Sequence, residues 1–167
     1  MVGGFKSLRN KSLIEVGCGR GGCLKYIVRE YAPKSTIGVD ISQENINFCN
    51  ETFMTTSHQA KPIQGDVRFV LGDSQKLTEA LTHFSETEDR RITETADVVM
   101  NVESSHCYPD LDAFFSGVSE ALKDENSVFL YTDFRYITEY GKVQQAVRRH
   151  FEVIKEEDLT RNVFRSL

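Results

Sequence analysis

Glycines and a carboxylate with ligand-binding chemistry stand near the start of this 167-residue chain. Residues 13–22 read Leu-Ile-Glu-Val-Gly-Cys-Gly-Arg-Gly-Gly, a short apolar run that carries Glu15 and passes at once into a glycine-rich stretch. Gly17, Gly19 and Gly21 let a backbone turn tightly and approach a ligand without Cβ clashes. A helix is expected just after them, and its free N–H groups would face the loop. The pattern predicts a binding site for a nucleotide-like ligand.

Two cofactors compete for this loop. Gly17, Gly19 and Gly22 fit the G-x-G-x-x-G pattern of dinucleotide-binding proteins, which alone is a weak signal. Glu15 disfavours a dinucleotide, because a carboxylate would repel a pyrophosphate, whereas it suits the sulfonium and ammonium charges of S-adenosylmethionine. The stretch resembles motif I of class I S-adenosylmethionine-dependent methyltransferases. A glycine-rich turn that binds nothing is the third interpretation.

Two further acidic residues follow short apolar runs. Asp40 comes about 20 residues after the glycines, where an acidic side chain can bind a ribose diol. The alternative is a helix cap, which Ser42 can also provide. In the resembled family an acid at the position of Asp73 contacts the adenine amino group; the alternative is a solvated turn aspartate. The predicted S-adenosylmethionine contacts are Glu15, Gly17, Gly19, Gly21, Asp40, Ile41, Asp73, Ser74 and Asn101.

A polar and aromatic stretch follows the apolar run 96–101, and reads Val-Glu-Ser-Ser-His-Cys-Tyr-Pro-Asp. It resembles motif IV of small-molecule methyltransferases. It is similar to the segment of bacterial sugar and polyketide O-methyltransferases and of phthiotriolone-type lipid methyltransferases, and more distantly to sterol and tocopherol C-methyltransferases. Residues 158–163 resemble a segment of the phthiotriolone-type group, so the resemblance covers nearly the whole chain.

Histidine suits the proton transfer that a hydroxyl acceptor requires. A histidine at the position of His106 is the assigned base in the sugar O-methyltransferases, although Cys107 replaces a second histidine that they can carry. Asp133 is placed to orient His106 or the acceptor, and Glu103 to bind an acceptor hydroxyl or the donor's ammonium group. The alternatives are structural: His106 caps or packs on a helix, Glu103 binds backbone, and Tyr108 is an aromatic wall or ordinary core. No metal site is expected.

Strands and helices are expected to alternate and to position these residues. The predicted strands are 13–16, 35–40, 67–71, 96–101, 127–133 and 151–156, and the predicted helices are 20–32, 43–58, 110–123 and 138–149. Polar residues 85–95 are typical of a surface loop. The order predicts an α/β fold with a doubly wound, mostly parallel sheet, the Rossmann-like class I methyltransferase fold without its last strand.

Composition is that of one soluble domain, with 40% hydrophobic and 27% charged residues. The net charge of −5 disfavours a nucleic-acid surface. The chain lacks an apolar run long enough for a transmembrane helix, and its start shows no secretory signal. The four cysteines lack paired metal-ligand spacing, which favours reduced thiols and a cytoplasmic location.

Residues 1–167 are expected to form one S-adenosylmethionine-binding core that is shorter at both ends than the family it resembles. The main hypothesis is methyl transfer to a small-molecule acceptor, a hydroxyl of a lipid, polyketide or sugar-like compound, with S-adenosyl-L-homocysteine as product. The alternatives are C-methylation, a non-catalytic S-adenosylmethionine-binding module or inactive fragment acting through a partner, and a NAD-dependent oxidoreductase. An unpaired sheet edge at 151–156 would favour a homodimer or a completing partner chain.

Overall fold

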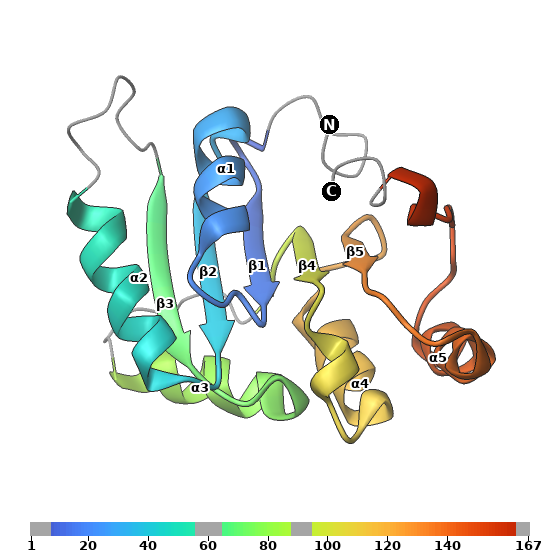
Figure 1. The fold of residues 1–167 in the computed structure, drawn as a ribbon. Helices are drawn as coiled ribbons and strands as arrows, with labels where there is room; N and C mark the ends of the chain where they lie inside the picture. Colours follow the sequence, from blue (N-terminus) through green and yellow to red (C-terminus); the bar gives the residue numbers. More distant parts are fainter. Residues whose placement is uncertain (1–7, 56–64, 88–94, 163–167) are drawn as a thin grey trace.

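One parallel sheet forms the centre of the molecule. The computed structural model describes residues 8–55, 65–87 and 95–162, and within them five strands pair in the order β3-β2-β1-β4-β5 (Figure 1). The strands are β1 (Ser12–Val16), β2 (Ser35–Asp40), β3 (Asp66–Leu71), β4 (Val98–Val102) and β5 (Val128–Thr132). The helices are α1 (Gly22–Tyr31), α2 (Gln43–Thr55), α3 (Leu77–Thr87), α4 (Leu111–Ala121) and α5 (Ile137–His150), with 3₁₀ turns η2 (Ser74–Lys76) and η3 (Ser105–Cys107). The predicted doubly wound α/β fold is confirmed.

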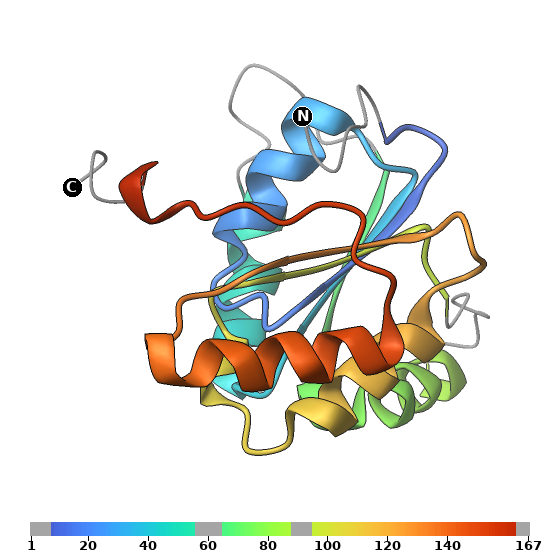
Figure 2. The same ribbon diagram turned by 90° about the vertical axis from the view of Figure 1, so that its right-hand side faces the viewer.

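Alternating side chains of the strands build two separate apolar layers. Figures 1 and 2 show α1 and α2 on one face of the sheet, and α3, α4 and α5 on the other. Ile14 and Val16 of β1 pack with α3 and α4, whereas Leu13 packs with α1 and α2. Because successive side chains of a strand point to opposite faces, Glu15 lies on the α1 side with Leu13. The sheet is thus covered on both faces, as a parallel sheet requires.

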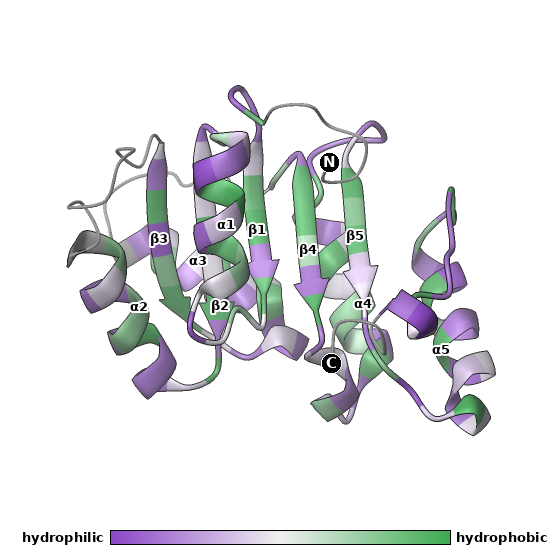
Figure 3. Cartoon of the chain, turned by 45° about the horizontal axis from the view of Figure 1, so that its top comes forward, coloured by the Kyte–Doolittle hydropathy of each residue, from purple (hydrophilic) through white to green (hydrophobic). Residues whose placement is uncertain are grey.

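The strand order places the chemistry at the carboxyl ends of β1 and β4. From β1 the chain runs outward through β2 and β3, then returns to pair β4 with the other side of β1, in the register Leu13↔Val98. Open α/β sheets bind ligands where the strand order reverses in this way. Figure 3 shows that the largely apolar strands β1 and β4 each carry a hydrophilic band near the arrow tip. The polar residues next to the strand ends are Glu15 in β1 and Asn101 in β4. This edge is where the site is expected.

Two parts of the predicted element list are wrong. Residues 151–159, which include the predicted strand 151–156, form no strand. Phe151 packs on Phe129 with ring centroids 5.0 Å apart, and most of the residues after it are exposed. Helix α3 was not predicted, and it takes the first residues of the expected loop 85–95. The rest of that loop, 88–94, and positions 56–58 of the predicted second helix lie outside the described residues.

Candidate functional site

The glycine loop after β1 has a left-handed backbone at the three positions where the sequence places glycine. Gly17, Gly19 and Gly21 have φ values of 73°, 54° and 71°, a region that other residues rarely adopt. The backbone N–H groups of Gly17 and Cys18 both donate to the carbonyl oxygen of Val39, at 2.8 and 3.0 Å. The loop is therefore tied to the end of β2 and leads directly into α1.

Glu15 is buried beneath this loop rather than open to solvent. Its side chain is 2% exposed and lies against the Cys23 thiol and the backbone N–H of Leu24, at the start of α1. Burial raises the pKa of Glu15 to about 7, against the lowering effect of those two hydrogen bonds. Since the carboxyl is then partly protonated at neutral pH, its repulsion of a pyrophosphate is weaker than the sequence alone suggests.

Asp40 joins the glycine loop to α2. Its Oδ2 accepts from the backbone N–H of Gly19 at 2.8 Å, and its Oδ1 accepts from the N–H of Ser42 at 3.0 Å and the side-chain amide of Asn45 at 3.1 Å. Ser42 Oγ accepts from the N–H of Asn45 at 3.3 Å, so Ser42 performs the capping that was the alternative task for Asp40. Three of the about four acceptor sites of the carboxylate are thus used, and Oδ2 keeps one for a ribose hydroxyl.

The other predicted donor contacts lie along the same edge. Asp73 caps η2, with Oδ1 accepting from the N–H of Gln75 at 2.9 Å, which fits both the turn and the adenine interpretation. Ser74 is buried, whereas Ile41 is 71% exposed directly after β2.

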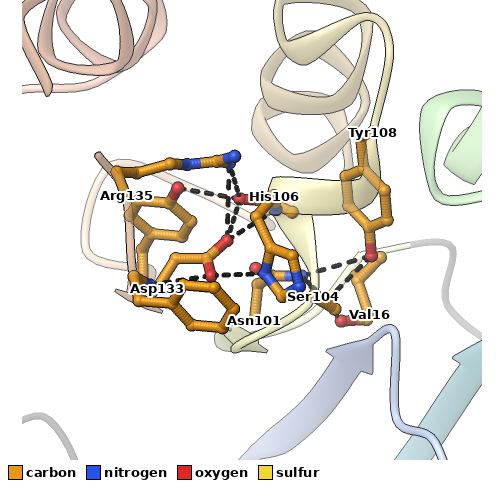
Figure 4. Close-up of polar contacts among 10 residues, drawn as sticks. Val16, Asn101, Ser104, His106, Tyr108, Asp133 and Arg135 are labelled. Carbon is orange, nitrogen blue, oxygen red and sulfur yellow. Dashed lines mark hydrogen bonds and ion pairs between the residues drawn. The ribbon is translucent and has the colours of Figure 1, made fainter. Parts of the chain in front are cut away.

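Asn101, at the end of β4, links β4 to β1. Its side-chain amide donates to the carbonyl oxygen of Val16 at 2.8 Å and to Ser104 Oγ at 2.7 Å (Figure 4). Ser104 Oγ lies 2.9 Å from the hydroxyl of Tyr108. A Cβ atom at Gly17 would lie 2.3 Å from Ser104 Oγ, so the polar group that follows β4 sits directly against the glycine loop.

His106 and Asp133 form a hydrogen-bonded pair beside this network. His106 Nδ1 lies 2.8 Å from Asp133 Oδ1, and the backbone N–H of His106 donates to Oδ2, also at 2.8 Å. The Phe134 ring lies against the imidazole, with centroids 4.1 Å apart. Asp133 is 1% exposed in its side chain and His106 28%. The carboxylate thus fixes the ring, and Nε2 has no hydrogen bond within the described part of the chain.

Sequence reasoning missed the residues that hold Asp133. Ser105 Oγ donates to Asp133 Oδ2 at 2.5 Å and contacts the Tyr131 hydroxyl at 2.8 Å. Arg135 donates to Ser105 Oγ at 2.7 Å and lies 3.4 Å from Asp133. A basic residue two positions after the acid was the only signal in the sequence. Glu103 takes no part in these contacts: it is exposed, has a φ of 49°, and its N–H donates to the carbonyl of Thr132.

The residues of this edge fit the predicted S-adenosylmethionine. Glu15 Oε2 and Asn101 Oδ1 are buried acceptors without a partner among the described residues, and both lie next to the glycine loop. Buried acceptors are stabilised by a ligand that brings hydrogen-bond donors or positive charge. Within the described residues no three histidine, cysteine or acidic side chains gather as metal ligands.

These features, a switch-point glycine loop with an acid at the end of the next strand, define a Rossmann-like ligand-binding protein. Residues 7–164 match the model of the methyltransferase domain family, and the chain belongs to that family. Its membership agrees with the resemblance drawn from motifs I and IV.

Relatives and solved structures share this fold. The chain is 35% identical over 128 residues to the fatty-acid O-methyltransferase of Mycolicibacterium smegmatis, covering 77% of this chain and 39% of the relative. It is 33% identical over 140 residues to a probable phthiotriol/phenolphthiotriol dimycocerosates methyltransferase of Mycobacterium ulcerans, covering 84% and 46%. The chain therefore spans less than half the length of these relatives.

Two solved structures show the same fold at lower identity. The cyclase SpnF has a TM-score of 0.70 at 15% identity, covering 92% of this chain and 56% of that one. A polyketide-synthase O-methyltransferase of Brevibacillus brevis, solved with S-adenosyl-L-homocysteine, has a TM-score of 0.54 at 19% identity, covering 75% and 36%. A cyclase on this fold illustrates that the fold alone does not set the reaction.

Proposed function

We propose that this chain binds S-adenosylmethionine and transfers its methyl group to a hydroxyl of a small-molecule acceptor. The observation that carries the proposal is the His106–Asp133 pair, held 2.8 Å apart at the carboxyl ends of β4 and β5, beside the glycine loop. Family membership and relatives that are named methyltransferases support it.

The proposed roles follow from the contacts. S-adenosylmethionine, when bound, supplies a methyl group already activated by a sulfonium. The glycine loop, Asp40, Ile41, Asp73, Ser74 and Asn101 bind it. Because Asp133 fixes the Nδ1 side of His106, the Nε2 side is directed to accept the proton of the acceptor hydroxyl. Glu103 is an acceptor-binding candidate at the exposed rim.

Apolar side chains next to His106 favour a lipid or polyketide acceptor over a sugar. A row of four apolar residues in the β5–α5 connection and the first turn of α5 is exposed: Phe134 61%, Tyr136 81%, Ile137 88% and Tyr140 46%. Phe134 is in ring contact with His106, so this surface begins at the proposed base. Exposed apolar area of this kind is typical of sites that bind apolar ligands. None of the helices in the described ranges is long and apolar enough to cross a membrane.

Donor binding is the first test. Calorimetric titration of the chain with S-adenosylmethionine, with NAD as comparator, should show binding of the former alone. Asp40→Ala should abolish it, because the loop loses its tie at Gly19. Asp66→Ala is the matched control, since Asp66 stands at the far end of β3 and pairs with Arg68 on the surface. Binding of NAD alone, or of neither ligand by a folded chain, would contradict the proposal.

Methyl transfer is the second test. The chain, incubated with S-adenosylmethionine carrying a labelled methyl group, is offered a phenolic lipid, a long-chain fatty acid and a free hexose. Label in the phenolic lipid supports the proposal, whereas label in the fatty acid alone would mean that the acceptor group is a carboxylate rather than a hydroxyl. Donor binding without label in any acceptor would favour a binding module that works through a partner.

A further inference from the structure

The Tyr108 hydroxyl lies above the first glycine of the loop. A Cβ atom at Gly17 would come within 2.6 Å of it, so only the absence of a side chain lets the phenol lie there. Tyr108 follows η3, and its ring packs edge-on against Phe114 of α4, with centroids 5.0 Å apart. The aromatic body is therefore anchored in the α4 layer, while the oxygen reaches the loop. Burial raises the pKa of the phenol, which keeps it protonated at neutral pH.

A chain of hydrogen bonds fixes that oxygen. Because Asn101 donates to the carbonyl of Val16, its amide cannot be flipped, and its second N–H goes to Ser104 Oγ. Ser104 Oγ in turn lies 2.9 Å from the Tyr108 hydroxyl, and the Asn101 amide nitrogen lies 3.4 Å from the same oxygen. Figure 4 shows this network together with the His106–Asp133 pair; Ser104, His106 and Tyr108 come from the same segment after β4, and Asp133 from the end of β5. The phenol oxygen thus has a set position at the end of the network that lies against Gly17.

The Tyr108 hydroxyl lies at the switch point of the sheet, between the carboxyl ends of β1 and β4. Gly17 directly follows β1, and Asn101 lies in β4, the two strands that pair through Glu15↔Met100. A ligand held by the glycine loop at this switch point therefore has the Tyr108 oxygen as a neighbour. Asn101 Oδ1 is a buried acceptor without a partner among the described residues, so this end of β4 carries a second electron-rich atom.

We propose that Tyr108 is a donor-binding residue whose phenol oxygen faces the positive sulfonium of S-adenosylmethionine. The inference rests on the proposed function and extends it, since it assigns the residue that tells the charged methyl donor from its neutral product. An oxygen lone pair held in a water-poor site is attracted to a cation much more strongly than to a neutral thioether. Tyr108 therefore favours the donor over S-adenosyl-L-homocysteine and helps to release the product.

The test is the ratio of two dissociation constants in Tyr108→Phe. The substitution keeps the ring on Phe114 and removes only the hydroxyl, so the chain is expected to fold, which a thermal unfolding curve checks. We expect the affinity for S-adenosylmethionine to fall about fivefold to tenfold, and that for S-adenosyl-L-homocysteine by less than about twofold, because the partial negative charge of the oxygen attracts a sulfonium but not a neutral thioether at the same place. Tyr26→Phe, on the exposed face of α1, is the matched control.

Each outcome decides between the two proposals. If wild type binds both ligands and Tyr108→Phe weakens both equally, or neither, Tyr108 only supports the fold and the inference is wrong while the proposed function stands. If wild type binds neither ligand, the proposed function fails and the inference with it. A loss confined to S-adenosylmethionine, absent in Tyr26→Phe, establishes the assignment.

Discussion

The two ends of the sheet are built differently. On the glycine-loop side, residues 12–49, strands β1 and β2 are buried almost throughout, and backbone groups shape the site. On the β5 side, residues 128–162, every residue of β5 is only half-buried, and α5 buries just Val143 and Ala146. The glycine-loop side is thus shaped by backbone groups of buried strands, whereas the β5 side presents side chains from partly exposed elements. Under the proposed function, the contrast predicts that the fold determines donor binding and that the exposed residues of the β5 side determine acceptor choice.

The largest effect is expected at the β5 side, on turnover. His106→Gln should slow methyl transfer to a hydroxyl by about 10²–10⁴-fold, the usual contribution of a general base, or about 3–5 kcal/mol of activation free energy. Donor affinity should not change, because His106 does not touch the glycine loop. Rate measurements with the phenolic lipid and calorimetry with S-adenosylmethionine check both halves.

A carboxylate acceptor sharpens this prediction. A fatty acid is already ionised at neutral pH and needs no base, so its methylation should lose far less in His106→Gln. Cys107→Ser, the exposed neighbour, is the matched control and should keep wild-type rates. Equal losses for both acceptors would mean that His106 positions the acceptor rather than removing a proton.

The second prediction concerns the contribution of Glu15 to the free energy of unfolding, which we expect to change by about 3 kcal/mol with pH. Its pKa rises from 4.5 unfolded to about 7 folded, so between these values the folded state holds more protons. The contribution of Glu15 to the free energy of unfolding should therefore be largest below pH 4.5. It should fall as pH rises towards 7, by at most about 1.4 kcal/mol for each step of one in pH. Glu15→Gln should remove this fall.

Denaturant unfolding of both proteins from pH 5 to pH 8 measures it. The stability of Glu15→Gln relative to wild type should increase with pH over that range and level off above pH 7. A difference independent of pH would show that the carboxyl titrates alike in the folded and unfolded chain.

Much of the glycine-loop side could be predicted from sequence, because local patterns determine it. Strand β2 has the bounds expected from its apolar run and terminal acid. Outside that side, helix α3 was not predicted although Leu77, Leu81 and Phe84 repeat at helical spacing, because the polar residues 85–95 indicate a loop.

The β5 side depends on contacts that no local pattern encodes. The apolar spacing of Phe151 and Val153 suggested a strand, yet a strand needs a partner, and here Phe151 packs on an aromatic cluster while Glu156 binds Tyr140 and Gln144 of α5. Asp133 was placed near His106 correctly. Its anchors, Ser105 and Arg135, follow from the β4–β5 register, which the sequence does not display.

The third prediction is a loss of about 2–3 kcal/mol in the free energy of unfolding on Gly17→Ala, which tests how closely the glycine-loop side is packed. Gly17→Ala meets both a left-handed φ, costing about 1–2 kcal/mol, and overpacking against Ser104 and Tyr108, costing about 1 kcal/mol or more. Gly19→Ala shares the φ but has no atom within 4 Å of its Cβ, so it should lose only the first part. Equal unfolding free energies for the two variants would contradict the close contact at Gly17.

The smallest expected effect is a gain in stability rather than a loss, and it concerns the β5 side. Gly141 lies inside α5, and a Cβ there meets no atom within 4 Å. Gly141→Ala should therefore stabilise the protein by about 0.5–1 kcal/mol, through helix propensity and lower entropy of the unfolded chain. A melting temperature about 1–4 °C higher, with donor affinity unchanged, is expected. A fall in melting temperature would mean that α5 is packed more tightly than its exposure suggests, and that the two sides differ less than their burial implies.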